Sequence, residues 1–272
     1  MYTAESDIQA GFHKRLLNFF YKFSANQDLY LLELPPIIKS KNEIKIVHYY
    51  LNKLFNCSYD SCDFDEFIFN PNLIQLLFGN AKQFYVQNCI LSNFAHNIEH
   101  LFQFILNNLV GETLAIEFYL DKDILEKYRD TLFKILMIRG NNFKKVHLKF
   151  YNTPEMSNFL LNVTMLYEHI VEYIAISRDC STIVSEIILD YSSPTSLKLC
   201  ERAEKVEIKQ LNRIKFTKYQ ISNIHNSKAK YSVCNKESHS AFSDFDIQIR
   251  IIKEYNGMDQ FILKSEKCKN RT

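Results

Sequence analysis

Two cysteines and two histidines supply the side chains that a zinc site needs. Cys57 and Cys62 lie in the stretch CSYDSC, while His96 and His100 lie in HNIEH, at positions i and i+4 of an expected helix. That spacing puts both imidazoles on one helix face, as a two-histidine clamp requires. The interval between the two pairs is far longer than in a compact zinc finger. A turn with two cysteines beside two surface histidines explains the same residues, so zinc binding is the weaker alternative and no cofactor is expected.

The pentad SRDCS, residues 177–181, places a thiol beside an arginine, an aspartate and two hydroxyls. A nucleophilic Cys180 would need a depressed pKa, and the usual sources are a helix N-terminus or a cationic partner. Cys180 instead follows an expected helix, whose dipole opposes a thiolate at that end. We therefore expect the pentad to end a helix, with Arg178 and Asp179 paired. A cysteine-based enzyme remains an alternative, with His169 as the nearest upstream base.

No motif of a nucleotide-binding or hydrolytic enzyme occurs in the chain. The patterns G-x-G-x-x-G, G-x-x-x-x-G-K-[ST] and G-x-S-x-G are all missing from the sequence. We expect a protein that is not an enzyme.

A basic run without Asp or Glu extends from residue 209 to residue 230. Its cations are Lys209, Arg213, Lys215, Lys218, Lys228 and Lys230; the aromatic residues Phe216 and Tyr219 lie among them, and Tyr231 follows the last. Such a run could bind nucleic acid through phosphates and base stacking, or it could be a solvated strand face. Because the net charge is only +2, we favour an acidic protein partner. The candidate partner-binding residues are Lys209, Arg213, Lys215 and Lys218.

Composition indicates a folded intracellular protein. Of the 272 residues, 47% are hydrophobic, and Gly and Pro number five each, which favours long regular elements over disorder. The N-terminus has no apolar core of a secretory signal, and no stretch is apolar enough to span a membrane. Seven cysteines, an odd number, suit a reducing compartment. We expect a soluble protein of the cytoplasm or nucleus.

Helical spacing of apolar residues predicts two N-terminal helices, at 8–23 and 42–55. The connector between them contains two prolines, which disfavour helix. Extended runs then alternate with helical ones, with strands starting near residues 64, 84, 114, 146, 186 and 205. Gly111 and Gly140 are expected helix stops, and SLKLCERAE (196–204) is expected to be a short helix. After residue 211, alternating apolar and polar residues predict antiparallel strands.

Repeated strand and helix units predict an α/β fold with a parallel sheet. The intervals between strands are loosely those of leucine-rich repeats, and VHLKFYN resembles their strand. We predict a leucine-rich-repeat-like curved solenoid with a helical N-terminal part and a β-rich C-terminal end; a doubly wound sheet is second. The expected division is a helical region at 1–56, a repeat-like domain at 57–211, a β-rich cap at 212–264 and a tail at 265–272.

Four stretches together resemble the large, divergent family of nematode F-box proteins. They are LFNCSYDSCDFDEFIFNPNLIQLLF (54–78), LFKILMIRGNNFKKVHLKF (132–150), IVEYIAISRDCSTIV (170–184) and ERAEKVEIKQLNRIKFTKYQISNIHN (201–226). The resemblance covers roughly residues 42–253 and extends to the F-box-associated regions of other nematode proteins.

This resemblance implies a non-enzymatic adaptor whose C-terminal region presents a surface for a protein substrate. In that family an N-terminal F-box binds a Skp-type adaptor of a cullin-RING ubiquitin ligase. The first forty residues carry no evident F-box, since LELPPII (32–38) has the Leu-Pro of an F-box start without the helical leucines that should follow. We expect a protein-binding module of this kind, with no membrane or nucleic-acid partner.

Overall fold

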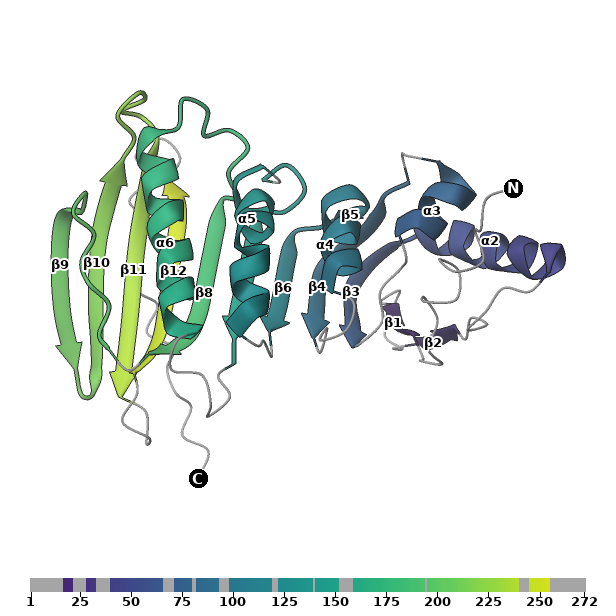
Figure 1. Ribbon diagram of the computed structural model, residues 1–272, viewed down its shortest axis with the longest axis horizontal. Coiled ribbons are helices and arrows are strands. Elements are labelled where there is room, and N and C mark those ends of the chain that lie inside the picture. Colours follow the sequence, from purple (N-terminus) through teal and green to yellow (C-terminus); the bar gives the residue numbers. More distant parts are fainter. Residues whose placement is uncertain are drawn as a thin grey trace.

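The computed structural model describes residues 17–21, 28–32, 40–65, 71–79, 82–92, 98–118, 122–138, 140–151, 159–193, 195–239 and 245–254 (Figure 1). The helices are α2 (Lys41–Phe55), α3 (Pro71–Phe78), α4 (Ile98–Asn107), α5 (Lys122–Ile138) and α6 (Phe159–Ile176). The strands are β1 (Leu17–Tyr21), β2 (Asp28–Leu32), β3 (Ser58–Asp65), β4 (Phe84–Ser92), β5 (Leu109–Val110), β6 (Thr113–Phe118), β7 (Lys145–Phe150), β8 (Glu186–Ser193), β9 (Glu204–Leu211), β10 (Ile214–Ser222), β11 (Lys230–His239) and β12 (Phe245–Glu254).

All these strands belong to one 12-stranded sheet in the order β2-β1-β3-β4-β6-β7-β8-β12-β11-β10-β9, with β5 beside β4. From β3 to β8 neighbouring strands run parallel, and their order in space is their order in the chain. Helices α3 to α6 lie in the connections between these strands. The expected α/β class with a parallel sheet is confirmed.

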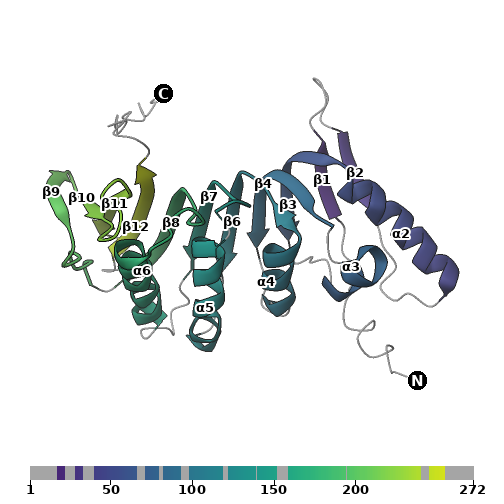
Figure 2. The same ribbon diagram turned by 90° about the horizontal axis from the view of Figure 1, so that it is seen from above.

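The described helices all lie on one side of the sheet (Figure 2). A right-handed crossover from each strand to the next in one direction places every helix on the same face. A doubly wound sheet would carry helices on both faces. The opposite surface of the sheet, which no described helix covers, is called the open face below.

The C-terminal strands extend the sheet in antiparallel pairing. After β8 the chain crosses to the far edge as β9, returns through β10 and β11, and ends with β12 inserted between β11 and β8. The antiparallel strands expected after residue 211 are thus confirmed up to residue 254, and a further expected strand, QFILKS (260–265), lies outside the described residues. Their last member joins them to the parallel strands, so the expected boundary after residue 211 falls in the turn between β9 and β10.

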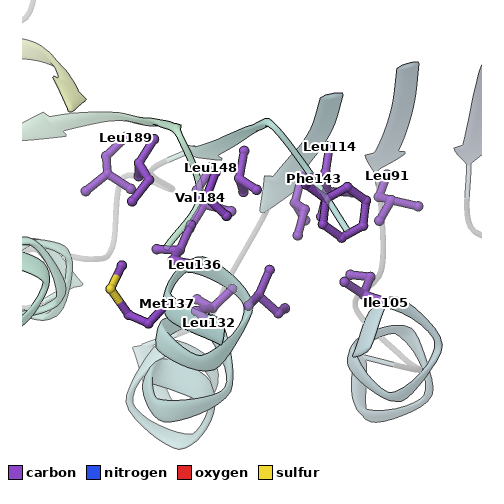
Figure 3. Close-up of a cluster of buried hydrophobic side chains, with 14 of the residues drawn as sticks. Leu91, Ile105, Leu114, Leu132, Leu136, Met137, Phe143, Leu148, Val184 and Leu189 are labelled. Atoms are coloured by element: carbon purple, nitrogen blue, oxygen red, sulfur yellow. The ribbon is translucent and has the colours of Figure 1, made fainter. Parts of the chain in front are cut away.

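The core lies between the helices and the sheet. Figure 3 shows Leu132, Leu136 and Met137 of α5 and Ile105 of α4 facing Leu91, Leu114, Leu148 and Leu189 of four neighbouring strands. Each of these side chains is almost fully buried. Because the strands alternate buried and partly exposed residues, every second side chain is left for the open face.

Local signals explain several element boundaries. Ser40 caps α2 by accepting a hydrogen bond from the Glu43 backbone N–H at 3.2 Å, and the Ser-x-x-Glu order is that of a capping box. Gly111 is not a helix stop, since α4 ends at Asn107. A Cβ at Gly111 would lie 2.0 Å from the carbonyl oxygen of Val86, so close backbone packing against β4 requires glycine here.

Two expected helices are wrong where the structure describes them. The helix expected at 8–23 contains β1 at Leu17–Tyr21, and the rest of that segment lies outside the described residues. The segment SLKLCERAE is irregular up to Ala203, and Glu204 begins β9; residues 195–203 are called the strap below. Helical periodicity is overridden in the strap by tertiary contacts: Ser196 and Leu197 bond the Glu237 carboxylate, and Arg202 bonds Glu172 of α6. None of the helices that the structure describes is long and apolar enough to cross a membrane.

Candidate functional site

The open face is built from the alternate residues of strands whose other side faces the core. In β7 the buried positions are Val146, Leu148 and Phe150, which leaves Lys145, His147 and Lys149 on the open face. Glu186 and Asp190 of β8 lie on the same surface, because they meet these side chains across the strands. Because the parallel strands pair in register, their alternate polar residues lie side by side and form a continuous polar surface.

Ion pairs link the strands of the open face. The Glu186 carboxylate lies 3.3 Å from Lys145 Nζ and 2.9 Å from Arg250 Nε, so one side chain of β8 contacts both neighbouring strands. His147 Nε2 lies 2.7 Å from Asp190 Oδ2. These groups are partly exposed, so each contact stabilises the fold only modestly. Their main effect is to fix side-chain positions on this surface.

One cross-strand row runs the width of the C-terminal half of the sheet. Residues in register on seven neighbouring strands make up this row: Glu117, Lys149, Asp190, Gln248, Lys236, Phe216 and Lys209. We call it the open-face row. It carries three lysines and two carboxylates.

A cavity of about 370 Å³ lies over the middle of the open-face row. Its polar lining comes from the carboxyl ends of β7, β8 and β11 and from the start of β12: Lys149, Tyr151, Asp190, Ser192, Lys236, Ser238, Asp246 and Gln248. Ligand sites of open α/β sheets gather at carboxyl ends of strands where the strand order changes. Here the change is the insertion of β12 beside β8.

The cavity offers hydrogen-bonding groups of both kinds. Lys149 Nζ lies 4.7 Å from the centre of the Tyr151 ring and 3.5 Å from the Glu117 carboxylate. The Tyr151 hydroxyl, with a smaller contribution from Glu117, raises the pKa of Lys149, which is therefore positively charged at every physiological pH. Ser192 donates to Asp246 at 3.1 Å. Lys236 is exposed and extends into the same space.

The four candidate partner-binding residues are separated by the structure. Lys209 lies in the open-face row, 3.7 Å from the Glu207 carboxylate, and Lys218 lies on the same face opposite Cys234. Arg213 is exposed in the turn between β9 and β10. Lys215 points to the other face of the sheet.

Lys215 is part of a buried contact that holds the strap. Its Nζ lies 3.2 Å from Glu237 Oε1 and 3.3 Å from Ser196 Oγ. The Glu237 side chain is only 3% exposed, and its second oxygen accepts from the hydroxyl of Ser196 and, at 3.3 Å, from the backbone N–H of Leu197. Lys215 thus has a structural role.

The structure describes three residues of the zinc alternative, Cys57, Cys62 and His100, and does not bring them together as a metal site. Cys62 is buried in the core at 2% exposure, and Cys57 packs against that core. His100 lies in α4, and His96 lies outside the described residues. Within the part of the chain that the structure describes, no three His, Cys, Asp or Glu side chains are placed to hold a metal ion.

Cys180 lies beyond the end of α6, where the sequence places it. Its thiol donates to the Ser177 carbonyl oxygen at 3.8 Å, and the backbone carbonyl oxygen of Cys180 accepts a hydrogen bond from Lys253 Nζ at 2.6 Å. Asp179 accepts from the Ser181 N–H at 2.8 Å, in place of the expected pairing with Arg178. The Ser181 hydroxyl, followed by this backbone hydrogen bond, lowers the pKa of Asp179.

Asn223 completes the end of α6. Its amide nitrogen donates to the carbonyl oxygens of Ile174 and Ser177 at 2.7 and 2.8 Å, and the Ile224 N–H donates to Ala175 at 2.9 Å. Helix carbonyls that lack partners at a C-terminus are satisfied in this way. The loop after β10 thus closes α6, and SRDCS is part of that junction.

Sequence reasoning missed the cavity residues Lys149, Asp190, Lys236 and Gln248. The one local signal in the sequence is that each of them occupies a polar position in a strand of alternating polar and apolar residues. Their proximity follows from the register of four strands, and the pairing of β12 with β8 links segments more than fifty residues apart.

Residues 5–121 match the model of a family described as a domain of unknown function, DUF8381. The matched part reaches from the N-terminal region through β6 and ends before every residue that lines the cavity. No curated protein matches the chain.

Proposed function

We propose that this chain is a non-enzymatic protein-binding module that takes an acidic segment of a partner protein on its open face. The observation that carries this proposal is the open-face row with its cavity of about 370 Å³. Successive strands supply Lys149, Lys236 and Lys209 along one line. An extended partner segment lying across the strands would meet these ammonium groups in turn.

The charges of this surface favour an acidic partner in its antiparallel half. The cations on the open faces of β9 to β12 include Arg250, Lys218, Lys230, Lys236 and Lys209, and the carboxylates there are Asp246, Glu254, Glu207 and Glu204. Phe216 in the same row adds an aromatic surface between Lys236 and Lys209. Complementary charge speeds association and selects among partners.

The arrangement of strands and helices resembles that of repeat proteins, and this likeness also supports the proposal. Parallel strands in chain order, with helices on one side, are the arrangement of leucine-rich-repeat solenoids, which bind partners on extended surfaces. Together with the resemblance to nematode F-box proteins, this supports a role like that of an F-box substrate-recognition region. A cullin-RING ubiquitin ligase is then the assembly in which the chain would act.

Affinity purification with mass spectrometry tests the proposal with three tagged chains. The unmodified chain is compared with Lys236→Glu, which reverses charge on the open face, and with Lys134→Glu, which makes the same change at an exposed position of α5 on the helix layer. We expect specific partners to be kept by Lys134→Glu and lost by Lys236→Glu. Reconstitution with each purified partner should show binding that weakens as salt is raised.

Two outcomes would contradict the proposal. Partners that are lost with Lys134→Glu and kept with Lys236→Glu would move the binding surface to the helices, and a chain that retains no specific partner would leave the open face without a role. Recovery of a Skp-type adaptor and a cullin would support ligase membership. Partners recovered without either would place the module outside that ligase.

A further inference from the structure

Among the strands that the structure describes, none pairs with the outer edge of β9, and both faces of β9 are exposed. β9 is the last strand of the sheet, and all eight of its residues are exposed (Figure 1). Val206 and Ile208 are 40% and 62% exposed although they are large and apolar. An edge of this kind is a template for pairing with another strand.

The backbone groups aimed at this edge can be assigned from the hairpin. β9 and β10 are joined by a two-residue turn, with Leu211 opposite Ile214. Residues flanking such a turn form a hydrogen-bonded pair, and bonded and non-bonded pairs alternate from there. Ile208 therefore belongs to a non-bonded pair with Thr217 of β10. Its N–H and C=O point outward, as do those of Gln210.

We propose that β9 pairs antiparallel with β9 of a second copy of this chain, about a two-fold axis at Ile208. This goes beyond the proposed function, since the partner is the protein itself. In this register Ile208 faces Ile208 of the second copy, and Val206 faces Gln210. Glu207 faces Lys209, and by symmetry Lys209 faces Glu207.

The sequence EKVEIKQL (204–211) selects this register. A shift by two residues, centred on Glu207, would place Glu207 against Glu207 and Lys205 against Lys209. Opposed like charges destabilise a cross-strand pair, while opposed unlike charges stabilise it. The strand is thus complementary to itself in one register and repelled in the neighbouring one.

The dimer would join two sheets into one and place two open-face rows end to end, because Lys209 is the last residue of each row. A two-fold axis perpendicular to the sheet keeps the open faces on the same side. A partner with two acidic segments could then bind both copies at once, which raises its overall affinity. A contact restricted to one strand edge is small, so we expect a weak dimer.

Sedimentation velocity of the full chain tests the proposal over roughly 1 to 100 µM, a range suited to a small interface. We expect a monomer-dimer equilibrium in the unmodified chain. Glu207→Lys or Lys209→Glu alone puts like charges opposite each other at two symmetric contacts, and should raise the dissociation constant about tenfold. The double variant Glu207→Lys with Lys209→Glu restores both contacts and should restore the dimer.

Ile208→Pro is an independent probe. It removes an N–H that bonds nothing in β10 and would bond the second copy, and proline is tolerated on an edge strand when its N–H side faces solvent. We expect a folded monomer. A monomer at every concentration of the unmodified chain, or a dimer that the single charge reversals leave unchanged, would overturn the proposal. Failure of the double variant to recover the dimer would overturn the register.

Discussion

The carboxylate of Glu237 holds the strap against the sheet, and its replacement by glutamine should destabilise the protein. Both oxygens accept from donors: Oε1 from Lys215 Nζ at 3.2 Å, and Oε2 from the Ser196 hydroxyl and the Leu197 N–H. Glu237→Gln keeps the shape but turns one acceptor into an NH₂ group that faces donors. The strap then loses charge-assisted hydrogen bonds and gains a donor-donor contact in a site that is 3% exposed.

The magnitude follows from the number of bonds and their burial. Loss of one hydrogen bond to a charged group in a buried site costs about 1.5–3 kcal/mol. Lys215 is 37% exposed and can recover hydration, so we place the loss for Glu237→Gln at about 2 kcal/mol. For a chain of this size that lowers Tm by roughly 4–8 °C.

Chemical denaturation and hydrogen exchange measure the effect. We expect a lower free energy of unfolding and faster exchange at the Leu197 amide. The matched control is Glu201→Gln, the same change at an exposed position of the strap, which should stay within about 0.5 kcal/mol of the unmodified chain. A Glu237→Gln protein as stable as that control, with an unchanged Leu197 amide, would refute this account of the strap.

Three further outcomes follow from the geometry. Gly111→Ala should lower the free energy of unfolding in urea by more than about 3 kcal/mol, because its Cβ would lie 2.0 Å from a carbonyl oxygen of β4. The matched change Gly79→Ala meets nothing within 4 Å and should cost about 1 kcal/mol because of its positive φ. Cys180→Ser should lower the midpoint of thermal unfolding, since Cys180 is only 8% exposed, while leaving partner binding unchanged. The hydrogen bond from Lys127 lowers the pKa of Glu99 from its ordinary value of 4.5. The contribution of Glu99 to stability is therefore present above about pH 4.5 and is lost as the pH falls through the lower folded-state pKa. Glu99→Gln should flatten the acid limb of a curve of stability against pH.

The parallel half of the fold was accessible from sequence because its signals are local. KVHLKF alternates polar and apolar residues, and its apolar set faces the core as β7. The same alternation identified the strands β10 to β12. Each of these predictions needs only the period of one segment and its neighbours in the chain.

The strap and the N-terminal strands were missed because tertiary contacts outweigh local periodicity there. SLKLCERAE has helical spacing, but Glu237 of β11 and Glu172 of α6 bind its polar groups in an irregular conformation. No residue of this nine-residue segment indicates that Glu237 and Glu172 are its partners. The segment 17–21 likewise has helical spacing yet pairs with β2 and β3.

The cavity could not be found from sequence because it depends on where β12 inserts. Glu186 contacts Lys145 on one side and Arg250 on the other, so one carboxylate of β8 spans the junction between the parallel and antiparallel strands. The open-face row crosses that same junction, from Lys149 through Asp190 to Gln248. A binding surface made this way cannot be assigned to either half alone. It requires β12 in place, and any change that displaces β12 removes Asp246, Ile247 and Gln248 from the cavity lining together with the sheet pairing that holds β8.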